Sequence, residues 1–386
     1  MDKKEFPINT NKERYLAVLS SPKTLYDFLW IYLAYGSEFE WDLLALPAGK
    51  NSENGNWTVK IEECAKSSGI FKDVYIYQDA LIDSSLFKKI KEFLSFFAYF
   101  LIRKQTLLSK KKIKEVINID QYNNIVTVYQ GTIFNGMIVS LSGEKNISLI
   151  EDGARSYVEH RRYPRMDAIR REGLELELAG FILSRMGYAD VTIEYDFKPL
   201  YNCINYSARP DDLRYRKYRE IRKMHDMNLV DKKVFANLIK KTFGIENMKE
   251  EYDAILFTSP IVFEYKVKND ISKNICDYIS KKHLNGEICL KKHHRDNENY
   301  TFSNKIKCVK IASNIPAEIF ISSIKTKMIY FMWPSTLISS LPSEINYKVL
   351  FDSSLSNDHY SQEHIEFAMK VIGLNSNNII DIGKND

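Results

Sequence analysis

The segment from Lys291 to Asp296 places lysines, histidines and an arginine directly after an apolar run. Such side chains can bind a phosphate, and a protonated histidine can also give a proton to a phosphate as it leaves. That chemistry suits glycosyl transfer from a phosphate donor. A solvated basic turn is the alternative, since one basic cluster is weak evidence. Lys291 and His293 are the candidate residues.

Hydroxyl side chains follow two other apolar runs. Ser335 and Thr336 come after the run from Met328 to Trp333 and begin a helical pattern. Hydroxyls beside the free backbone N–H groups of a helix start can hold a phosphate, although an ordinary N-cap looks the same. Ser20 and Ser21 follow the first run of the chain in the same way and are candidate donor ligands too.

Carboxylates occupy two further positions of this kind. Glu318, in the first turn of a helix expected from Pro316, could accept hydrogen bonds from ribose hydroxyls, or could simply complement the helix dipole. Asp152 lies in Glu151-Asp152-Gly153 after a short strand and could take a proton from an acceptor hydroxyl. Turn chemistry also explains an Asp-Gly pair.

Strands and helices must alternate to position these residues. Strands are expected at Tyr15–Leu19, Leu43–Leu46, Val74–Tyr77, Ile125–Tyr129 and Ile147–Ile150, with a helix at Ser85–Leu107. A second set is expected at Ala254–Thr258, Glu287–Leu290, Ile306–Ile311, Met328–Phe331 and Tyr347–Phe351, with helices at Asp270–Lys282, Pro316–Ser323 and Ser335–Leu341. This alternation predicts two doubly wound α/β domains, whose ligands lie beyond the carboxyl ends of the strands.

The expected boundaries are an N-terminal Rossmann-like domain over residues 1–210, a basic connection over 211–251 and a C-terminal Rossmann-like domain over 252–386. A chain of 386 residues with 45 % apolar and 27 % charged residues fits two folded domains. The net charge of +5 is too small to indicate nucleic acid. The basic residues between Arg161 and Lys223 are either solvated faces or a surface for an anionic membrane or glycan.

The compartment is expected to be cytoplasmic, with contact at the inner face of the membrane as the most that the sequence suggests. The five cysteines form no C-x-x-C pair, and the first ten residues do not read as a secretory signal. The most apolar stretch, Phe93 to Ile102, has about half the length of a membrane-spanning helix.

Together these segments resemble bacterial sialyltransferases of the GT-B type, which include lipooligosaccharide sialyltransferases and capsular polysialyltransferases. Those families have a D/E-D/E-G motif in the first domain and a K-x-H-P motif in the second, followed by a P-x-E-like helix and a Ser/Thr pair. The corresponding segments here agree in order and spacing, and they are Glu151–Gly153, Lys291–His294, Pro316–Glu318 and Ser335–Thr336. His294 stands where the family motif has proline.

The resemblance implies that Asp152 is the general base and that His293 protonates the departing phosphate. Lys291, Ser335 and Thr336 would support that phosphate, while Glu318 would hold the cytidine ribose. Glu264 is the alternative base, because some lipooligosaccharide sialyltransferases have an important acidic residue in that region. We favour Asp152, since a base should face the donor.

The function expected is an inverting transfer of sialic acid, or a related nonulosonic acid, from its CMP-activated form to a hydroxyl of a bacterial capsule or lipooligosaccharide. No D-x-D tripeptide occurs in the sequence, so we expect a reaction without a metal cofactor. The alternatives are another donor, such as CMP-Kdo or a nucleoside diphosphate sugar, and a non-catalytic glycan-binding protein. The acceptor, the linkage and the oligomeric state, with a homodimer as one option, are left open.

Overall fold

The computed structural model of this protein describes most of two sheets and the helices around them. The described residues are 13–46, 57–77, 110–128, 138, 141–142, 147–151, 203–207, 210–212, 219–226, 228–245, 249, 251–259, 270–293, 296–312, 315–323, 325–333, 345–354 and 375–383. All structural statements below concern these residues.

The first sheet has seven parallel strands in the order β3-β2-β1-β4-β5-β6-β7. The strands are β1 (Arg14–Leu19), β2 (Glu40–Ala45), β3 (Phe71–Ile76), β4 (Asn124–Val128), β5 (Ile147–Ile150), β6 (Ile204–Ser207) and β7 (Glu220–Lys223). The order reverses between β1 and β4, which makes this pair the switch point where doubly wound sheets bind their ligands.

The first sheet is buried on both faces. In β1, Leu16 and Val18 belong to one apolar cluster, while Ala17 and Leu19 belong to the other. A strand that packs apolar side chains on both sides reads as a continuous apolar run, which is typical of parallel sheets covered by helices. This explains why the sequence pattern located β1 within one residue.

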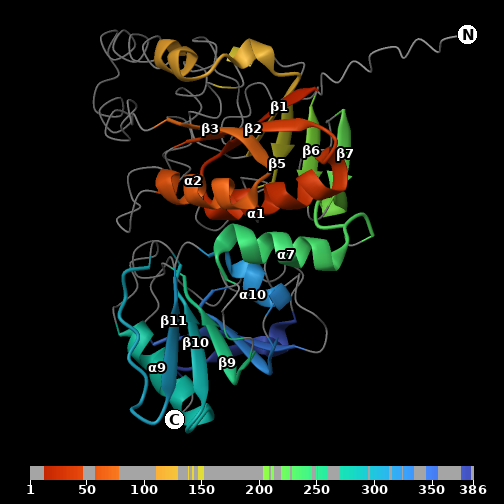
Figure 1. Ribbon diagram of the computed structural model, residues 1–386. Helices are drawn as coiled ribbons and strands as arrows, with labels where there is room; N and C mark the ends of the chain where they lie inside the picture. The colour runs from red at the N-terminus through yellow and green to blue at the C-terminus, as the bar shows by residue number, and fades with distance from the viewer. Residues whose placement is uncertain are drawn as a thin grey trace, which may run out of the picture.

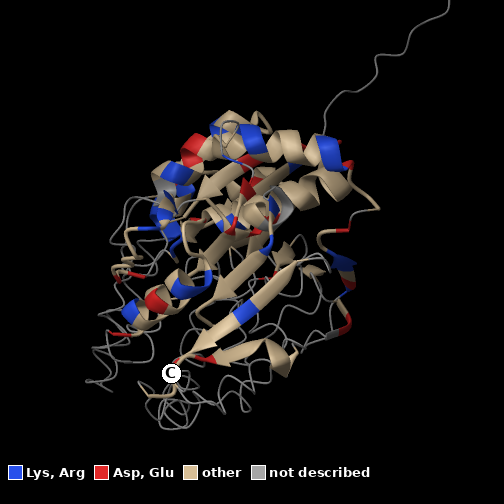
Figure 2. Cartoon of the chain, turned by 90° about the horizontal axis from the view of Figure 1, so that it is seen from below, with Lys and Arg blue, Asp and Glu red and all other residues tan. Residues whose placement is uncertain are grey.

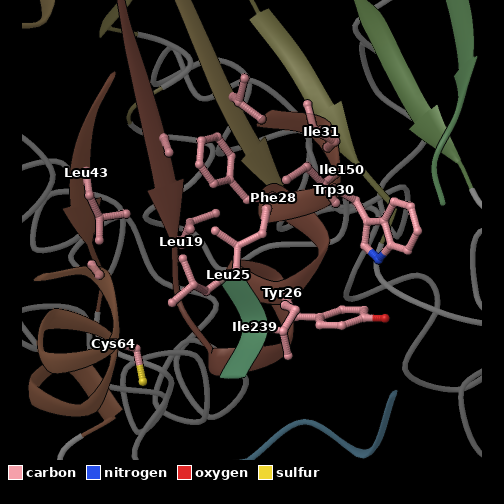
Figure 3. Packing of buried hydrophobic residues seen from close by; sticks show 14 of the residues in the cluster. Leu19, Leu25, Tyr26, Phe28, Trp30, Ile31, Leu43, Cys64, Ile150 and Ile239 are labelled. Atoms are coloured by element: carbon pink, nitrogen blue, oxygen red, sulfur yellow. The ribbon is translucent and has the colours of Figure 1, made fainter. Parts of the chain in front are cut away.

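Helices cover one face of this sheet. They are α1 (Pro22–Ile31), continued by a π-helical turn (Tyr32–Gly36), α2 (Trp57–Ser68) and α7 (Lys232–Phe243). Short 3₁₀ turns lie at Ile119–Gln121 and Pro210–Asp212. Figure 3 shows Ile239 of α7 beside Tyr26 and Leu25 of α1, so α7 packs as an outer layer on the first domain.

The second sheet has six parallel strands in the order β11-β10-β9-β13-β14-β15. Its strands are β9 (Ala254–Phe257), β10 (Glu287–Lys291), β11 (Lys307–Ile311), β13 (Met328–Phe331), β14 (Asn346–Phe351) and β15 (Ile379–Asp381). Its described helices are α9 (Ile271–Lys282), α10 (Ala317–Ser323) and a 3₁₀ turn (Ser376–Asn378). A separate small parallel pair joins β8 (Glu251–Tyr252) to β12 (Lys325–Thr326).

The fold class predicted from the sequence is confirmed, because both sheets have the strand order of a doubly wound Rossmann-like domain. Two such domains in one chain agree with the expected GT-B arrangement. Most of the strand ribbon carries neither acidic nor basic residues, and these residues are seen mainly on helices and at strand ends (Figure 2). The chain thus keeps its chemical groups near the edges of the sheets.

The stretch 211–251, predicted to be a basic connection, is only partly a connection. Within it, β7 pairs with β6 and extends the first sheet, and α7 packs on α2 and α1. β7 was missed because its sequence, Glu-Ile-Arg-Lys, has no apolar run: it is an edge strand with exposed ends. The first domain therefore continues past residue 210.

The two domains share apolar packing. Ile319 of α10 is fully buried in the same cluster as Phe235 and Ile239 of α7 and the residues of α1. Figure 1 shows α7 between the helices α1 and α2 of the first sheet and α10 of the second. Through this packing, the start of α10 is brought against the first domain.

Candidate functional site

The carboxyl ends of strands from both sheets contribute charged residues to one region. Lys23 follows the end of β1, and His225 follows the end of β7. Lys291 is the last residue of β10, and Glu318 lies in the first turn of α10, which follows β11. Since ligands of doubly wound sheets bind beyond the carboxyl ends of the strands, this is the candidate functional site.

Lys291 is almost completely buried, with 5 % of its surface exposed. Its Nζ donates a hydrogen bond to the backbone oxygen of Lys292 at 3.1 Å. Burial lowers the pKa of Lys291 to about 8, while the charge of Glu318 acts in the opposite direction. The ammonium form is therefore disfavoured here, and a bound anion would favour it again.

Glu318 interacts with charges of both domains. Burial raises the pKa of Glu318; the charge of Lys23 lowers it, that of Asp27 raises it and that of His225 lowers it. Glu318 also acts on Lys291, so two of the residues predicted for one site are close in the fold. We call Lys23, Asp27, His225 and Glu318 the interdomain charge cluster.

Asp27 is the buried centre of this cluster. Its side chain is 0 % exposed, and its two oxygens lie 2.6 Å from Lys23 Nζ and 3.1 Å from His225 Nε2. Burial alone would raise the pKa of Asp27, but Lys23 and His225 outweigh that effect and lower it. The carboxylate is thus held in its ionised form by two partners.

His225 is fixed by its surroundings on several sides. Its backbone has φ of 60°, a left-handed conformation that costs energy in a residue other than glycine. Its ring lies near Tyr26 and Trp30, with centroid distances of 5.8 and 5.4 Å. The bond to Asp27 therefore ties the end of β7 to the middle of α1.

His293 lies just beyond Lys291, and its side chain is partly exposed. Its backbone is held on both sides, because its N–H donates to Thr258 Oγ1 at 3.0 Å and its carbonyl accepts from the N–H of Asp296 at 3.0 Å. The predicted pair of Lys291 and His293 therefore shares one restrained turn at the end of β10.

Ser21 is the N-cap of α1. Its Oγ accepts from the N–H of Thr24 at 3.2 Å, and its own N–H donates to Thr24 Oγ1 at 3.1 Å. Ser20 is partly buried between β1 and this cap. Pro316 is buried immediately before α10, and its carbonyl accepts from the N–H of Ile319 at 3.3 Å. That Ser20, Ser21 and Pro316 contact the nucleotide-sugar donor stays a prediction.

Four predicted site residues lie outside the described residues: Asp152, Glu264, Ser335 and Thr336. Glu151, the neighbour of Asp152, is buried and accepts from Ser207 Oγ at 2.8 Å. It therefore anchors the end of β5 to the end of β6. The preference for Asp152 over Glu264 as the general base stays a prediction.

The sequence reasoning missed Lys23, Asp27 and His225. Two signals were available: Asp27 interrupts an apolar run and so needs a partner, and Lys23 lies four residues before it, which is the spacing of a helical ion pair. The other partner of Asp27, His225, is 198 residues away, and no spacing rule connects the two.

Two other expectations stay predictions. Among the described residues, no group of three or more His, Cys, Asp or Glu side chains could hold a metal ion. In the same part of the chain, no helix is both long and apolar enough to cross a bilayer. Within the basic range Arg161–Lys223, Arg222 is engaged by both oxygens of Glu220 and lies over the Tyr35 ring.

Several solved structures resemble this chain over most of its length. UDP-N-acetylglucosamine 2-epimerase from Rickettsia bellii is 10 % identical, covers 95 % of this chain and 90 % of its own, and has a TM-score of 0.47. The glycotransferase of kitacinnamycin is 9 % identical, with coverages of 97 and 87 % and a TM-score of 0.48. A UDP-glucosyltransferase from Polygonum tinctorium is 9 % identical, with coverages of 96 and 87 % and a TM-score of 0.46. No protein-family model and no curated protein matches the chain.

Proposed function

We propose that this protein is a GT-B glycosyltransferase that binds a nucleotide sugar at the carboxyl end of its second sheet. The observation that supports this best is Lys291, a buried lysine at the end of β10 whose pKa is lowered to about 8. Perturbed ionisable groups at the ligand-binding edge of a sheet are candidates for function. A phosphate would restore the charge that burial disfavours.

The roles of the other residues follow from their positions. His293, on the same turn, would give a proton to the departing phosphate, and Glu318 would accept hydrogen bonds from the ribose. The acceptor oxygen would bond to the anomeric carbon as the bond from that carbon to the phosphate oxygen breaks. Asp152, or alternatively Glu264, would take the acceptor proton, and Ser335 and Thr336 would hold the phosphate.

The donor we propose is a CMP-activated sialic acid or related nonulosonic acid, and the acceptor a glycan of the bacterial surface. The support for this finer statement is the ordered set of motifs in the sequence, from Glu151–Gly153 to Ser335–Thr336. A monophosphate leaving group carries less charge than a diphosphate, so Lys291 and His293 could stabilise it without a metal ion.

Calorimetric titration with CMP and with UDP tests the donor class. We expect binding of CMP, and loss of that binding in Lys291→Met. Binding of UDP but not CMP would assign a diphosphate donor instead. If neither nucleotide binds but glycans do, the protein is a glycan-binding member of the fold.

A transfer assay then tests catalysis. With CMP-sialic acid and a galactose-terminated acceptor, we expect product formation by the wild type and a large loss in His293→Ala. Asp152→Ala and Glu264→Ala compared in the same assay identify the base. Lys281→Ala is the control, because Lys281 is exposed in the last turn of α9 and belongs to none of the proposed roles.

A further inference from the structure

A nearly closed ring of hydrogen bonds surrounds the backbone of His293. The His293 N–H donates to Thr258 Oγ1 at 3.0 Å. Burial raises the pKa of Tyr300, and the Thr258 side chain lies close enough to the Tyr300 hydroxyl to lower that pKa in part. The Tyr300 hydroxyl donates to Asp296 Oδ2 at 2.8 Å. The Asp296 N–H then donates to the carbonyl of His293 at 3.0 Å, which completes the ring.

The donors and acceptors of this ring run in one direction. The Thr258 hydroxyl accepts from the His293 N–H, the Tyr300 hydroxyl donates to Asp296, and the series ends at a carboxylate, which only accepts. Thr258, Tyr300 and Asp296 are 6, 5 and 2 % exposed, so water does not compete for these bonds. A satisfied buried network of this kind holds its members in one arrangement.

Other contacts attach the ring to the sheet. The N–H of Thr258 donates to the carbonyl of Lys291 at 3.1 Å, so Thr258 holds both Lys291 and His293 through their backbones. The Tyr300 hydroxyl oxygen (Oη) also lies 3.0 Å from the Sδ of Met332, just beyond β13. Its single proton serves the carboxylate, which is the stronger acceptor. The ring therefore spans the switch point between β9 and β13.

We propose that Thr258, Tyr300 and Asp296 are positioning residues that orient His293 for its action on the donor phosphate. This role rests on the proposed function. The restraint acts on the His293 backbone, because both its N–H and its carbonyl are hydrogen-bonded.

Thr258→Val tests the ring with little change of shape. Loss of the acceptor for the His293 N–H should increase amide hydrogen exchange at His293 by about tenfold or more. In the transfer assay, kcat should fall between about tenfold and a hundredfold, with less than a threefold change in donor KM, because a misplaced group acts mainly on the transition state. Thr258→Ser keeps the hydroxyl and should restore both quantities.

Two further variants define the network. Tyr300→Phe removes a hydroxyl that contacts Asp296 but not the His293 backbone itself. It should therefore change hydrogen exchange and kcat in the same direction by a smaller amount. Thr242→Val is the matched control, because Thr242 in α7 is 2 % exposed and its Oγ1 has no hydrogen-bond partner among the described residues. It should leave exchange at His293, kcat and KM unchanged.

The readouts separate this proposal from the proposed function. Wild-type exchange at His293 in Thr258→Val, or wild-type kcat in a variant with increased exchange, would overturn the positioning role. Failure of Thr258→Ser to restore kcat would do so as well. If the wild type transfers no sugar, the proposed function fails. The positioning role then stands only if CMP shifts the NMR signals of the His293 imidazole and Thr258→Val abolishes that shift; otherwise it fails as well.

Discussion

The carboxyl ends of the two sheets treat buried charge differently. At the first sheet, the carboxylate of Asp27 has a cation at 2.6 Å and an imidazole at 3.1 Å, and its ionised form is favoured. At the second sheet, burial disfavours the charged form of Lys291 despite the field of Glu318. The charge of Asp27 at the first sheet is compensated by other groups of the protein, whereas a bound anion would stabilise the charged form of Lys291 at the second sheet.

This difference separates a structural role from a ligand-binding role. A buried ion with satisfied partners holds elements together, and removal of one partner leaves an uncompensated charge. A buried lysine with a lowered pKa costs stability and is more easily explained by a function. We therefore assign Asp27 to the architecture and Lys291 to the ligand site.

The largest expected effect is on the first sheet. Asp27→Asn should lower the free energy of unfolding at pH 7 by roughly 3 kcal/mol, because Lys23 loses its buried counterion and His225 its carboxylate hydrogen-bond partner. Urea denaturation measures this change. Asp73→Asn is the control, since Asp73 is half exposed and 3.7 Å from its partner Arg14, and it should have almost no effect.

The same variant has a pH signature. Because the fold lowers the pKa of Asp27, its stabilisation is present above its unfolded pKa and is lost as the pH falls through the folded value. The gap between wild type and Asp27→Asn should therefore narrow in acid. A gap that stays constant from pH 7 into acid would contradict the assigned role.

Lys291→Met should act in the opposite direction on stability. The fold lowers the pKa of Lys291 to about 8, so the cost of charging it is fully present below pH 8 and disappears as the pH rises towards the unfolded value. At pH 7 the variant should be more stable than the wild type, by at most roughly 3 kcal/mol. The advantage should vanish near pH 10, and nucleotide binding should be lost. If the variant is less stable than the wild type, Lys291 has a structural role like that of Asp27.

Ser21→Ala should have a smaller effect. The loss of the N-cap of α1 should reduce stability by about 1 kcal/mol, measured by urea denaturation. If Ser21 serves only as a cap, the KM for the donor stays unchanged; an increase in KM would add Ser21 to the binding site. Ser20→Ala, which leaves the cap intact, is the comparison.

The smallest expected signal is a fraction of a proton. Near pH 8, Lys291 is partly neutral, so the binding of a phosphate should be accompanied by proton uptake. Calorimetry with CMP in two buffers of different ionisation enthalpy measures this number. Uptake that persists in a variant such as Lys291→Arg, which cannot be neutral, would assign the proton to another group.

Much of the fold was predictable from local patterns. The runs that became β1, β5 and β13 were located within one residue, because central parallel strands are apolar on both faces. β7 was not found, since an edge strand of Glu-Ile-Arg-Lys has no such signal. α7 was also missed, because its apolar residues cover one face among many lysines.

The candidate site was predictable only where strand ends defined it. The rule that ligands bind beyond the carboxyl ends selected Lys291 and Glu318, which the fold brings close together. It selected neither Asp27 nor His225, whose meeting depends on how α1 packs against the segment that follows β7. Thr258 was also not singled out, although its hydroxyl holds the His293 backbone.

The sequence by itself determined the class of the two domains and the edge at which their chemistry lies. The domain class and this edge can both be read from apolar runs and from the residues that directly follow each run. These are patterns of positions that are neighbours in the sequence. The tertiary structure alone decided which charges are neutralised, since Asp27 meets His225 across 198 residues and Lys291 loses its water only by packing. Burial, and pairing between residues far apart in the sequence, are properties of the packed molecule; the Lys23–Asp27 pair, four residues apart in α1, follows a local spacing instead.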